Sequence, residues 1–320
     1  MKLTELIKQG TRTISRLYPE REAREMVLAY LCHTLSISRH THILEPVTEV
    51  PDEAVSVSES AFARMAAGEP LQYVTGRTSF YGRDFRVTPS VLIPRPETEL
   101  LCRLALESPV CRRAVSAAGC PDVSLHILDL CTGSGCIAWT MALEIPDAEV
   151  TAVDISEDAL SVASGQDFRE EMLVTGAEAP TFIKADVLHD PLSGTVMSVT
   201  TGKEASVMPG AYRTFPALGY DLILSNPPYV MDKEKALMRP NVLDHEPHLA
   251  LFVPDEDPLI FYRAIATHAA LLLSEGGMCI VEINEALGPE TAALFRSAGL
   301  SEVRIEPDLS DRPRYVVARR

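Results

Sequence analysis

The second half of the chain alternates short apolar runs with stretches of helical period, and this alternation constrains the fold more than any other feature. A short apolar run bounded by turn residues is typical of a strand buried on both faces. Strands that alternate with helices predict a doubly wound parallel sheet covered by helices on both faces. We therefore predict an α/β fold with a Rossmann-like, seven-stranded sheet. Its strands are residues 125–130, 149–155, 182–186, 220–226, 278–284, 302–306 and 315–318, and helices lie at 137–144, 156–164, 259–273 and 289–298.

The N-terminal part has a different pattern. Apolar side chains recur at helical spacing from Glu22 to Leu35, and a second helix opens at Asp52 and ends before Gly68-Glu69-Pro70. No glycine-rich loop or cluster of catalytic side chains appears there. Residues 1–74 are therefore predicted to form a small helical bundle that holds a partner or covers a cleft.

Residues 75–96 are predicted to be a β-hairpin linker, with strands on either side of a turn at Gly82-Arg83-Asp84. Residues 97–320 then form the domain that contains the sheet. Two segments inside it, 108–124 and 191–218, lack a clear period and contain many Gly, Pro, Ser and Thr residues. Both are expected to be surface insertions, and the second to be partly disordered.

The first predicted sheet strand runs into a glycine-containing turn. Asp129 lies near the strand end, Cys131-Thr132-Gly133-Ser134-Gly135 follows, and a helix comes next. Glycines let the backbone approach a ligand closely, and the helix N-terminus offers free N–H groups. Those N–H groups suit the methionine carboxylate of a bound S-adenosylmethionine. A nicotinamide dehydrogenase is disfavoured, because Cys131 replaces the first glycine of the dinucleotide pattern.

Acidic residues follow the next two strands. Asp154 lies 25 residues after Asp129, at the place where a carboxylate accepts from ribose hydroxyls, and Asp186 ends the third strand, where it can accept from an adenine amino group. Each acid alone is equally well a helix cap or turn former. Together with the glycine turn they predict one cofactor site, made of Asp129, Cys131, Thr132, Gly133, Ser134, Gly135, Asp154, Ile155, Asp186, Val187 and Asn226.

The tetrapeptide Asn226-Pro227-Pro228-Tyr229 ends the fourth strand, on the same edge of the sheet. The Asn226 side-chain oxygen and the Pro227 carbonyl can accept the two N–H groups of a planar amide or amine. Two fixed acceptors orient such a nitrogen toward a methyl donor, and Tyr229 can pack on its plane. These four residues are the predicted catalytic residues. The alternative for an isolated tetrapeptide is a proline-rich turn that caps a strand.

Charge and cysteine content narrow the class of partner and the compartment. The net charge of −16 and the pI of about 4.9 disfavour nucleic acid, whose phosphates an acidic surface repels. The seven scattered cysteines favour reduced thiols. No signal peptide or membrane span is recognised, so a cytoplasmic location is expected. No metal site is expected either, because the pair His245 and His248 surrounds Pro247 in a loop.

The motifs now described resemble the release-factor glutamine methyltransferases, the PrmC/HemK family. The resemblance spans nearly the whole chain and is carried by the segments Pro70-Leu71-Gln72-Tyr73, Phe80-Tyr81-Gly82, Leu92-Ile93-Pro94-Arg95-Pro96-Glu97-Thr98-Glu99 and Glu246-Pro247, besides the tetrapeptide. Enzymes that methylate other amino groups share the tetrapeptide but not these flanking motifs.

The resemblance implies a cofactor, S-adenosyl-L-methionine, with S-adenosyl-L-homocysteine as product. The acceptor would be the glutamine of the Gly-Gly-Gln motif in bacterial class I peptide chain release factors, and the N-terminal bundle would contact the release factor. Asn226 to Tyr229 would hold the glutamine, with Arg95 and Glu97 lining the cleft nearby. A monomer is expected.

The sequence departs from the family pattern at a few places. Cys131 stands where the family mostly has glycine, Gln166 where asparagine is common, and Val187 where an aromatic residue is frequent. The insertion 191–218 is longer than usual.

Two other functions fit parts of this pattern. An enzyme that methylates an exocyclic amine of adenine or guanine in nucleic acid could use the same tetrapeptide on a flipped base. A non-catalytic adaptor could use the fold for binding alone, although the intact acids and tetrapeptide argue against it.

Overall fold

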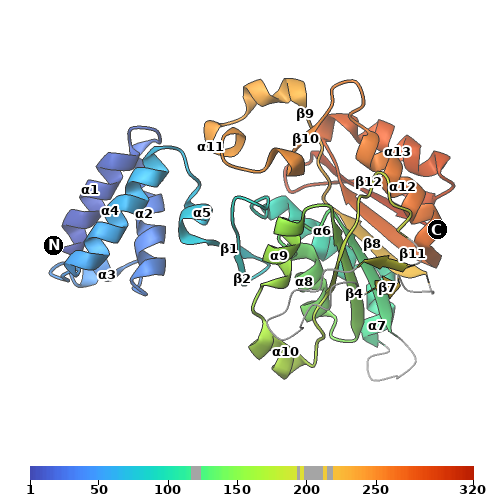
Figure 1. Cartoon of the computed structure of the whole chain (residues 1–320), viewed down its shortest axis with the longest axis horizontal. Helices are drawn as coiled ribbons and strands as arrows, with labels where there is room; N and C mark the ends of the chain where they lie inside the picture. The colour runs from blue at the N-terminus through green and yellow to red at the C-terminus, as the bar shows by residue number, and fades with distance from the viewer. Residues whose placement is uncertain (117–123, 193–194, 198–211, 215–218) are drawn as a thin grey trace. The chain divides into compact units, whose positions relative to one another are not determined.

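The computed structural model describes residues 1–116, 124–192, 195–197, 212–214 and 219–320 (Figure 1). The chain divides into two compact units. Unit 1 comprises residues 1–77 and 238–246, and unit 2 comprises residues 78–237 and 247–320. Each unit is described by itself.

Unit 1 is a helical bundle in which α1, α2 and α4 lie side by side (Figure 1). Its core is made of buried apolar side chains such as Leu6, Leu31, Phe62 and Met65, with the Tyr30 and Phe62 rings edge to face at 5.6 Å. The helical N-terminal bundle is thus confirmed. Its helices are α1 (Leu3–Ile14), α2 (Glu20–Thr34), α3 (Thr41–Leu44), α4 (Asp52–Ala66), α5 (Leu71–Thr75) and α11 (Pro240–Leu243).

Unit 1 is discontinuous in the sequence, because α11 and its flanks pack with it. Arg239 forms an ion pair with Glu22 across 3.4 Å. The His245 ring lies beside Gly68, with Nε2 3.4 Å from the position that a Cβ of residue 68 would occupy. The sequence pattern did not predict that residues 238–246 belong with the N-terminal helices.

Unit 2 is built on a seven-stranded sheet with the order β12-β13-β11-β8-β3-β4-β5. The number of strands is as predicted, but the prediction of a wholly parallel sheet is wrong at β13, which is antiparallel to both β11 and β12. The short turn from Asp308 to Arg312 makes β12 and β13 a hairpin, and a parallel pair would need a long crossover. The strands are β3 (Leu125–Leu130), β4 (Ala148–Asp154), β5 (Thr181–Lys184), β8 (Tyr220–Ser225), β11 (Leu273–Glu282), β12 (Ser301–Pro307) and β13 (Pro313–Arg319).

Helices cover both faces of this sheet, as predicted. Successive side chains of β3 point into opposite cores, with Ile127 in one and Leu128 in the other. The first core contains side chains of α6 (Pro96–Leu106), α7 (Pro109–Ser116), α8 (Cys136–Glu144) and α9 (Glu157–Ser164), with α10 (Arg169–Thr175) packed against it. The second contains side chains of α12 (Ile260–Leu272) and α13 (Gly288–Ser297).

The two predicted insertions are only partly described. The prediction of an irregular segment at 108–124 is wrong for its first half, which forms α7, with Val110 and Cys111 buried in the core. Within 191–218, β6 (Thr195–Met197) and β7 (Tyr212–Thr214) pair antiparallel. The predicted disorder of that insertion falls mostly on residues outside the described ranges.

The hairpin comprises β1 (Arg77–Phe80) and β2 (Arg83–Arg86). Its turn is Tyr81-Gly82, not the predicted Gly82-Arg83-Asp84. Both turn residues have positive φ, 49° and 76°, as a two-residue type I′ turn requires. Phe85 packs on Phe168 with ring centroids 5.0 Å apart, which attaches the hairpin to the first core.

The remaining elements are short. The strands β9 (Val230–Met231) and β10 (Phe252–Val253) pair in parallel, and short 3₁₀ helices occur at Asp232–Leu237, His248–Ala250 and Glu285–Leu287. None of the helices in the described ranges is long and apolar enough to cross a membrane.

Candidate active site

The site lies where the strand order of the sheet reverses. From β3 the chain adds β4 and β5 on one side, and it later returns to add β8 and β11 on the other. Leu130 and Ser225, the last residues of β3 and β8, are therefore register partners. In open α/β sheets ligands bind at this reversal, beyond the carboxyl ends of the strands. The glycine turn and the tetrapeptide follow these two residues directly.

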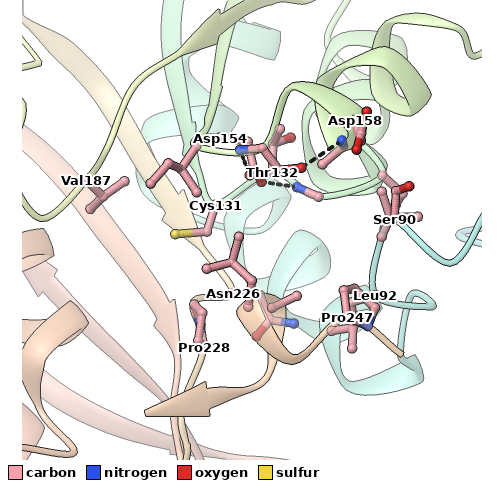
Figure 2. Close-up of a pocket in the computed structure, with 18 of the residues that line it drawn as sticks. Ser90, Leu92, Cys131, Thr132, Asp154, Asp158, Val187, Asn226, Pro228 and Pro247 are labelled. Atoms are coloured by element: carbon pink, nitrogen blue, oxygen red, sulfur yellow. Dashed lines mark hydrogen bonds between the residues drawn. The ribbon is translucent and has the colours of Figure 1, made fainter. Parts of the chain in front are cut away.

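A cavity of about 440 Å³ opens at this edge, a volume typical of small-molecule sites. Asp154 and Thr132 lie on one side of it and Asn226 and Pro228 on the other, with Cys131 between them (Figure 2). Of the site residues predicted from sequence, those that line the cavity are Cys131, Thr132, Gly133, Ser134, Asp154, Ile155, Asp186, Val187, Asn226 and Pro228. Those that do not line it are Asp129, Gly135, Pro227, Tyr229, Arg95 and Glu97.

The glycine turn has a left-handed backbone at three alternate residues, with φ of 62° at Cys131, 54° at Gly133 and 80° at Gly135. A Cβ at Gly135 would lie 3.0 Å from Ala163 Cβ and 3.1 Å from Trp139 Cδ1, so this glycine is required for packing. A Cβ at Gly133 would meet no atom within 4 Å. The absence of a side chain there leaves the cavity open beside the backbone.

Asp154 holds this turn in place. Its Oδ2 accepts from the Gly133 N–H at 2.9 Å, and its Oδ1 accepts from the Ser156 N–H at 2.9 Å. Burial raises the pKa of its carboxyl group. The carboxylate keeps further lone pairs at the cavity wall, where a ligand hydroxyl can donate to them.

Asp186 lies beyond the end of β5 and lines the cavity, but its carboxylate is occupied locally. Its Oδ1 accepts from the Leu188 N–H at 2.8 Å, and its Oδ2 lies 2.7 Å from His189 Nδ1. Burial raises its pKa, but the hydrogen bonds from His189 and Leu188 outweigh burial and leave the pKa below its usual value.

Asp129 is 0% exposed and lies behind the turn. The Thr132 hydroxyl donates to its Oδ2 at 2.5 Å. Its Oδ1 is also buried and has no hydrogen-bond partner in the described part of the chain. Burial raises the pKa of this carboxyl to about 7.

The Asn226 end of the cavity depends on two residues that the sequence reasoning missed as functional. Asn226 Nδ2 donates to Thr98 Oγ1 at 2.9 Å, and the Thr98 hydroxyl donates to Glu282 Oε2 at 2.8 Å. The Tyr229 hydroxyl donates to the other carboxylate oxygen, Oε1, at 3.0 Å. Glu282 is 1% exposed, and burial raises its pKa to about 7. One signal was available, because Glu282 is the only charged residue in the apolar run 278–283.

Gln166, noted above as a departure from the family pattern, supports the glycine turn from behind. Its Oε1 accepts from the Arg86 N–H at 2.8 Å, while its Nε2 donates to the Arg86 carbonyl at 2.9 Å and the Ser134 carbonyl at 3.1 Å. The longer amide thus reaches both the hairpin and the turn.

The cavity lining is largely apolar, with a few polar groups from the glycine turn, the strand-end acids and Asn226. All six cysteines in the described residues are free. Over the same residues, no three His, Cys, Asp or Glu side chains are grouped so that they could hold a metal ion. The site therefore offers hydrogen-bond acceptors and backbone N–H groups as its chemical resources.

The mixed seven-stranded sheet, with a glycine turn after β3 and acids after β4 and β5, defines the class: a Rossmann-like methyltransferase fold. Residues 5–76 match the model of the PrmC N-terminal domain. The chain is 36% identical over 321 residues to a release factor glutamine methyltransferase of Bacteroides thetaiotaomicron, covering 100% of this chain and 99% of that protein. It is 33% identical to that of Deinococcus radiodurans, again covering 100% and 99%.

The chain belongs to the release factor glutamine methyltransferase family. Among solved structures, a crystal structure of a protein-(glutamine-N5) methyltransferase (release factor-specific) from Alicyclobacillus acidocaldarius aligns with a TM-score of 0.37 and 26% identity, over 74% of this chain and 99% of that chain. The family assignment rests on the sequence relatives.

Proposed function

We propose that this chain transfers a methyl group from S-adenosylmethionine to the side-chain amide nitrogen of the glutamine in the Gly-Gly-Gln motif of peptide chain release factors. The observation that carries the proposal is the orientation of Asn226. Its Nδ2 is bound by Thr98, while its Oδ1 accepts no hydrogen bond from the described residues, at the wall of a cavity that also contains the glycine turn.

The residues of the glycine-turn side fit the cofactor. Gly133 leaves space that a Cβ would fill, Asp154 presents carboxylate oxygens, and helix α8 begins directly after the turn. We assign the cofactor site to the predicted set from Asp129 to Val187, with Asp129 and Gly135 acting from behind the wall. S-adenosylmethionine, when bound, supplies an activated methyl group, because its positively charged sulfonium becomes a neutral thioether when the methyl group is transferred.

Asn226 and Pro227 hold the acceptor in the proposal. Asn226 Oδ1 accepts one N–H of the glutamine amide, and the Pro227 carbonyl, to which no backbone N–H of the described residues donates, accepts the other. Two acceptors on one nitrogen stabilise the positive charge that develops there and fix its direction. No strong base is needed, because the proton leaves after transfer.

The release factor is proposed as the substrate because the relatives of this chain are release factor glutamine methyltransferases. The relatives described above are release factor glutamine methyltransferases over their full lengths. We assign contact with the release factor to residues 1–74, and the cleft near the glutamine to Arg95 and Glu97. We also propose that the protein is a monomer and is located in the cytoplasm.

The test is methyl transfer from labelled S-adenosylmethionine to purified release factor, with a release factor whose Gly-Gly-Gln glutamine is replaced by alanine as the matched control. Label on the intact factor alone is the expected result. Label on DNA or RNA but not on the factor would overturn the proposal in favour of a nucleic-acid enzyme. No transfer and no cofactor binding by calorimetry would favour an adaptor.

A further inference from the structure

The side chain of Asn226 can present either of two groups to the cavity. A half-turn of its amide exchanges Oδ1, an acceptor, with Nδ2, a donor. Only the first orientation suits an acceptor nitrogen that carries N–H groups, so some feature of the site must select it.

The hydrogen bonds behind Asn226 make that selection. Glu282 accepts from Thr98 on Oε2 and from Tyr229 on Oε1, so both of its oxygens are engaged as acceptors. The Thr98 hydroxyl has one proton, and that proton goes to Glu282. Thr98 Oγ1 can then only accept a further bond, and Asn226 satisfies it with Nδ2 at 2.9 Å.

The backbone fixes the same arrangement. Val281 is the register partner of Ser225, so Glu282 at the end of β11 is level with Asn226 after β8. Thr98 belongs to the first turn of α6 and is 2% exposed. Because Thr98 and Glu282 are both buried, water cannot easily replace either partner.

We propose that Glu282, acting through Thr98, is a positioning residue that sets the Asn226 amide with its oxygen toward the acceptor nitrogen. The inference rests on the proposed function and adds two residues to it. In this proposal both residues act on the acceptor only through Asn226, so they are positioning residues and not catalytic residues.

Loss of the Glu282–Thr98–Asn226 hydrogen bonds, here called the relay, has a definite consequence. Without Glu282 as an acceptor, the Thr98 proton can turn to Asn226 Oδ1. In a fraction of the molecules the Asn226 amide then flips. Its Nδ2 group faces the N–H groups of the acceptor, and two donors cannot form a hydrogen bond with each other. The rate of transfer should fall while the cofactor, which the glycine turn holds, binds as before.

The experiment compares Thr98→Val with Thr98→Ser in the full-length protein, with release factor as acceptor at pH 8. Valine keeps the shape but removes the hydroxyl, and serine keeps the hydroxyl. We expect kcat to fall about 10- to 100-fold in Thr98→Val and to stay within about 3-fold of wild type in Thr98→Ser. The Kd for S-adenosylmethionine should change less than about 2-fold in both.

Thr291→Val is the matched control, because Thr291 is likewise a buried helical threonine whose hydroxyl donates a hydrogen bond, here to the Leu287 carbonyl at 2.8 Å. It should lose stability without losing kcat. Unchanged kcat in Thr98→Val, or an equal loss in Thr98→Ser, would overturn the inference alone. No turnover by the wild type would overturn the proposed function and the inference with it.

Glu282→Gln keeps the test decisive if Thr98→Val does not fold. Glutamine has the same size but one acceptor oxygen for two hydroxyl donors. A kcat at least about 10-fold lower with unchanged cofactor affinity is expected, and a kcat equal to wild type would contradict the relay.

Discussion

Each end of the cavity is supported by a buried carboxylate, but the hydrogen bonds of the two carboxylates differ. At the glycine-turn end, the buried carboxylate of Asp129 accepts from the Thr132 hydroxyl, and its other oxygen has no partner in the described residues. At the Asn226 end, the buried carboxylate of Glu282 accepts from Thr98 on one oxygen and from Tyr229 on the other. Burial raises the pKa of both carboxyls to about 7.

The difference indicates what each end controls. Both carboxylate oxygens of Glu282 accept hydrogen bonds, and the last member of this network is Asn226, which lines the cavity. The glycine-turn end is instead shaped by backbone groups, such as the Gly133 N–H on Asp154. Changes at the Asn226 end should therefore alter the rate of transfer, and changes at the glycine-turn end should alter cofactor affinity or stability.

The largest effect is expected for Asn226→Ala. Removal of one fixed acceptor from the transition state should lower kcat about 100- to 1,000-fold, while the Kd for S-adenosylmethionine changes less than about 3-fold. Single-turnover methylation of release factor and calorimetry measure the two quantities. A loss of cofactor affinity as large as the loss of rate would show that the two ends are not separate.

Asp154→Asn should give the opposite result. The amide has only one acceptor oxygen for the Gly133 and Ser156 N–H groups, and it no longer carries a charge toward ligand hydroxyls. We expect cofactor affinity to fall about 10- to 100-fold. The value of kcat at saturating cofactor should stay within about 3-fold, and a fall in kcat at unchanged affinity would contradict this assignment.

The two glycines of the turn should separate stability from affinity. In Gly135→Ala the left-handed backbone and the collision with Ala163 should together lower the free energy of unfolding by about 2–3 kcal/mol. Gly133→Ala should cost only about 1 kcal/mol of stability, because its Cβ meets no atom. The same methyl group should weaken cofactor binding, since it enters the cavity.

Urea unfolding and calorimetry on both glycine variants provide the comparison. Equal losses of stability, with cofactor affinity unchanged in Gly133→Ala, would show that the open space beside residue 133 is not ligand space.

The smallest effect concerns pH. Asp129 and Glu282 have pKa values of about 7 in the fold, above their ordinary values of 3.8 and 4.5. The folded protein therefore binds protons that the unfolded chain has released, and this stabilisation is lost as the pH rises through 7. Each group should lower the free energy of unfolding by about 1 kcal/mol between about pH 6 and 8.

Asp129→Asn removes one of these two groups. Its free energy of unfolding should fall by about 1 kcal/mol less than that of wild type over the same pH range. Urea unfolding at the two pH values measures the difference, and equal falls in the two proteins would mean that Asp129 stays ionised in the fold.

Much of unit 2 was predictable, for a physical reason. A strand buried on both faces must be apolar throughout, so runs such as Leu125–Leu130 are visible in the sequence. The direction of β13 was not visible, because its buried residues Tyr315 to Ala318 would be apolar in either orientation. The carboxyl ends of β3 and β8 are neighbours in any doubly wound sheet, which is why the two main motifs could be placed together.

The support of Asn226 could not be predicted in the same way. Thr98 and Glu282 are 184 residues apart, and no local pattern states that they meet. The sequence showed only that a carboxylate stood in an apolar strand. The predicted roles of the individual site residues stay predictions until the variants above are measured.

The discontinuity of unit 1 bears on how this protein can be recombined with its relatives. The N-terminal family model ends at residue 76, yet the compact unit also includes residues 238–246. A chimera that exchanges only the first 77 residues would combine α1–α5 of one parent with α11 of the other. Positions such as Glu22 and Arg239, 217 residues apart, would then come from different ancestors. Transfer of the complete helical unit therefore needs two gene fragments. One encodes residues 1–77, and the other encodes residues 238–246, which lie between the two segments of unit 2.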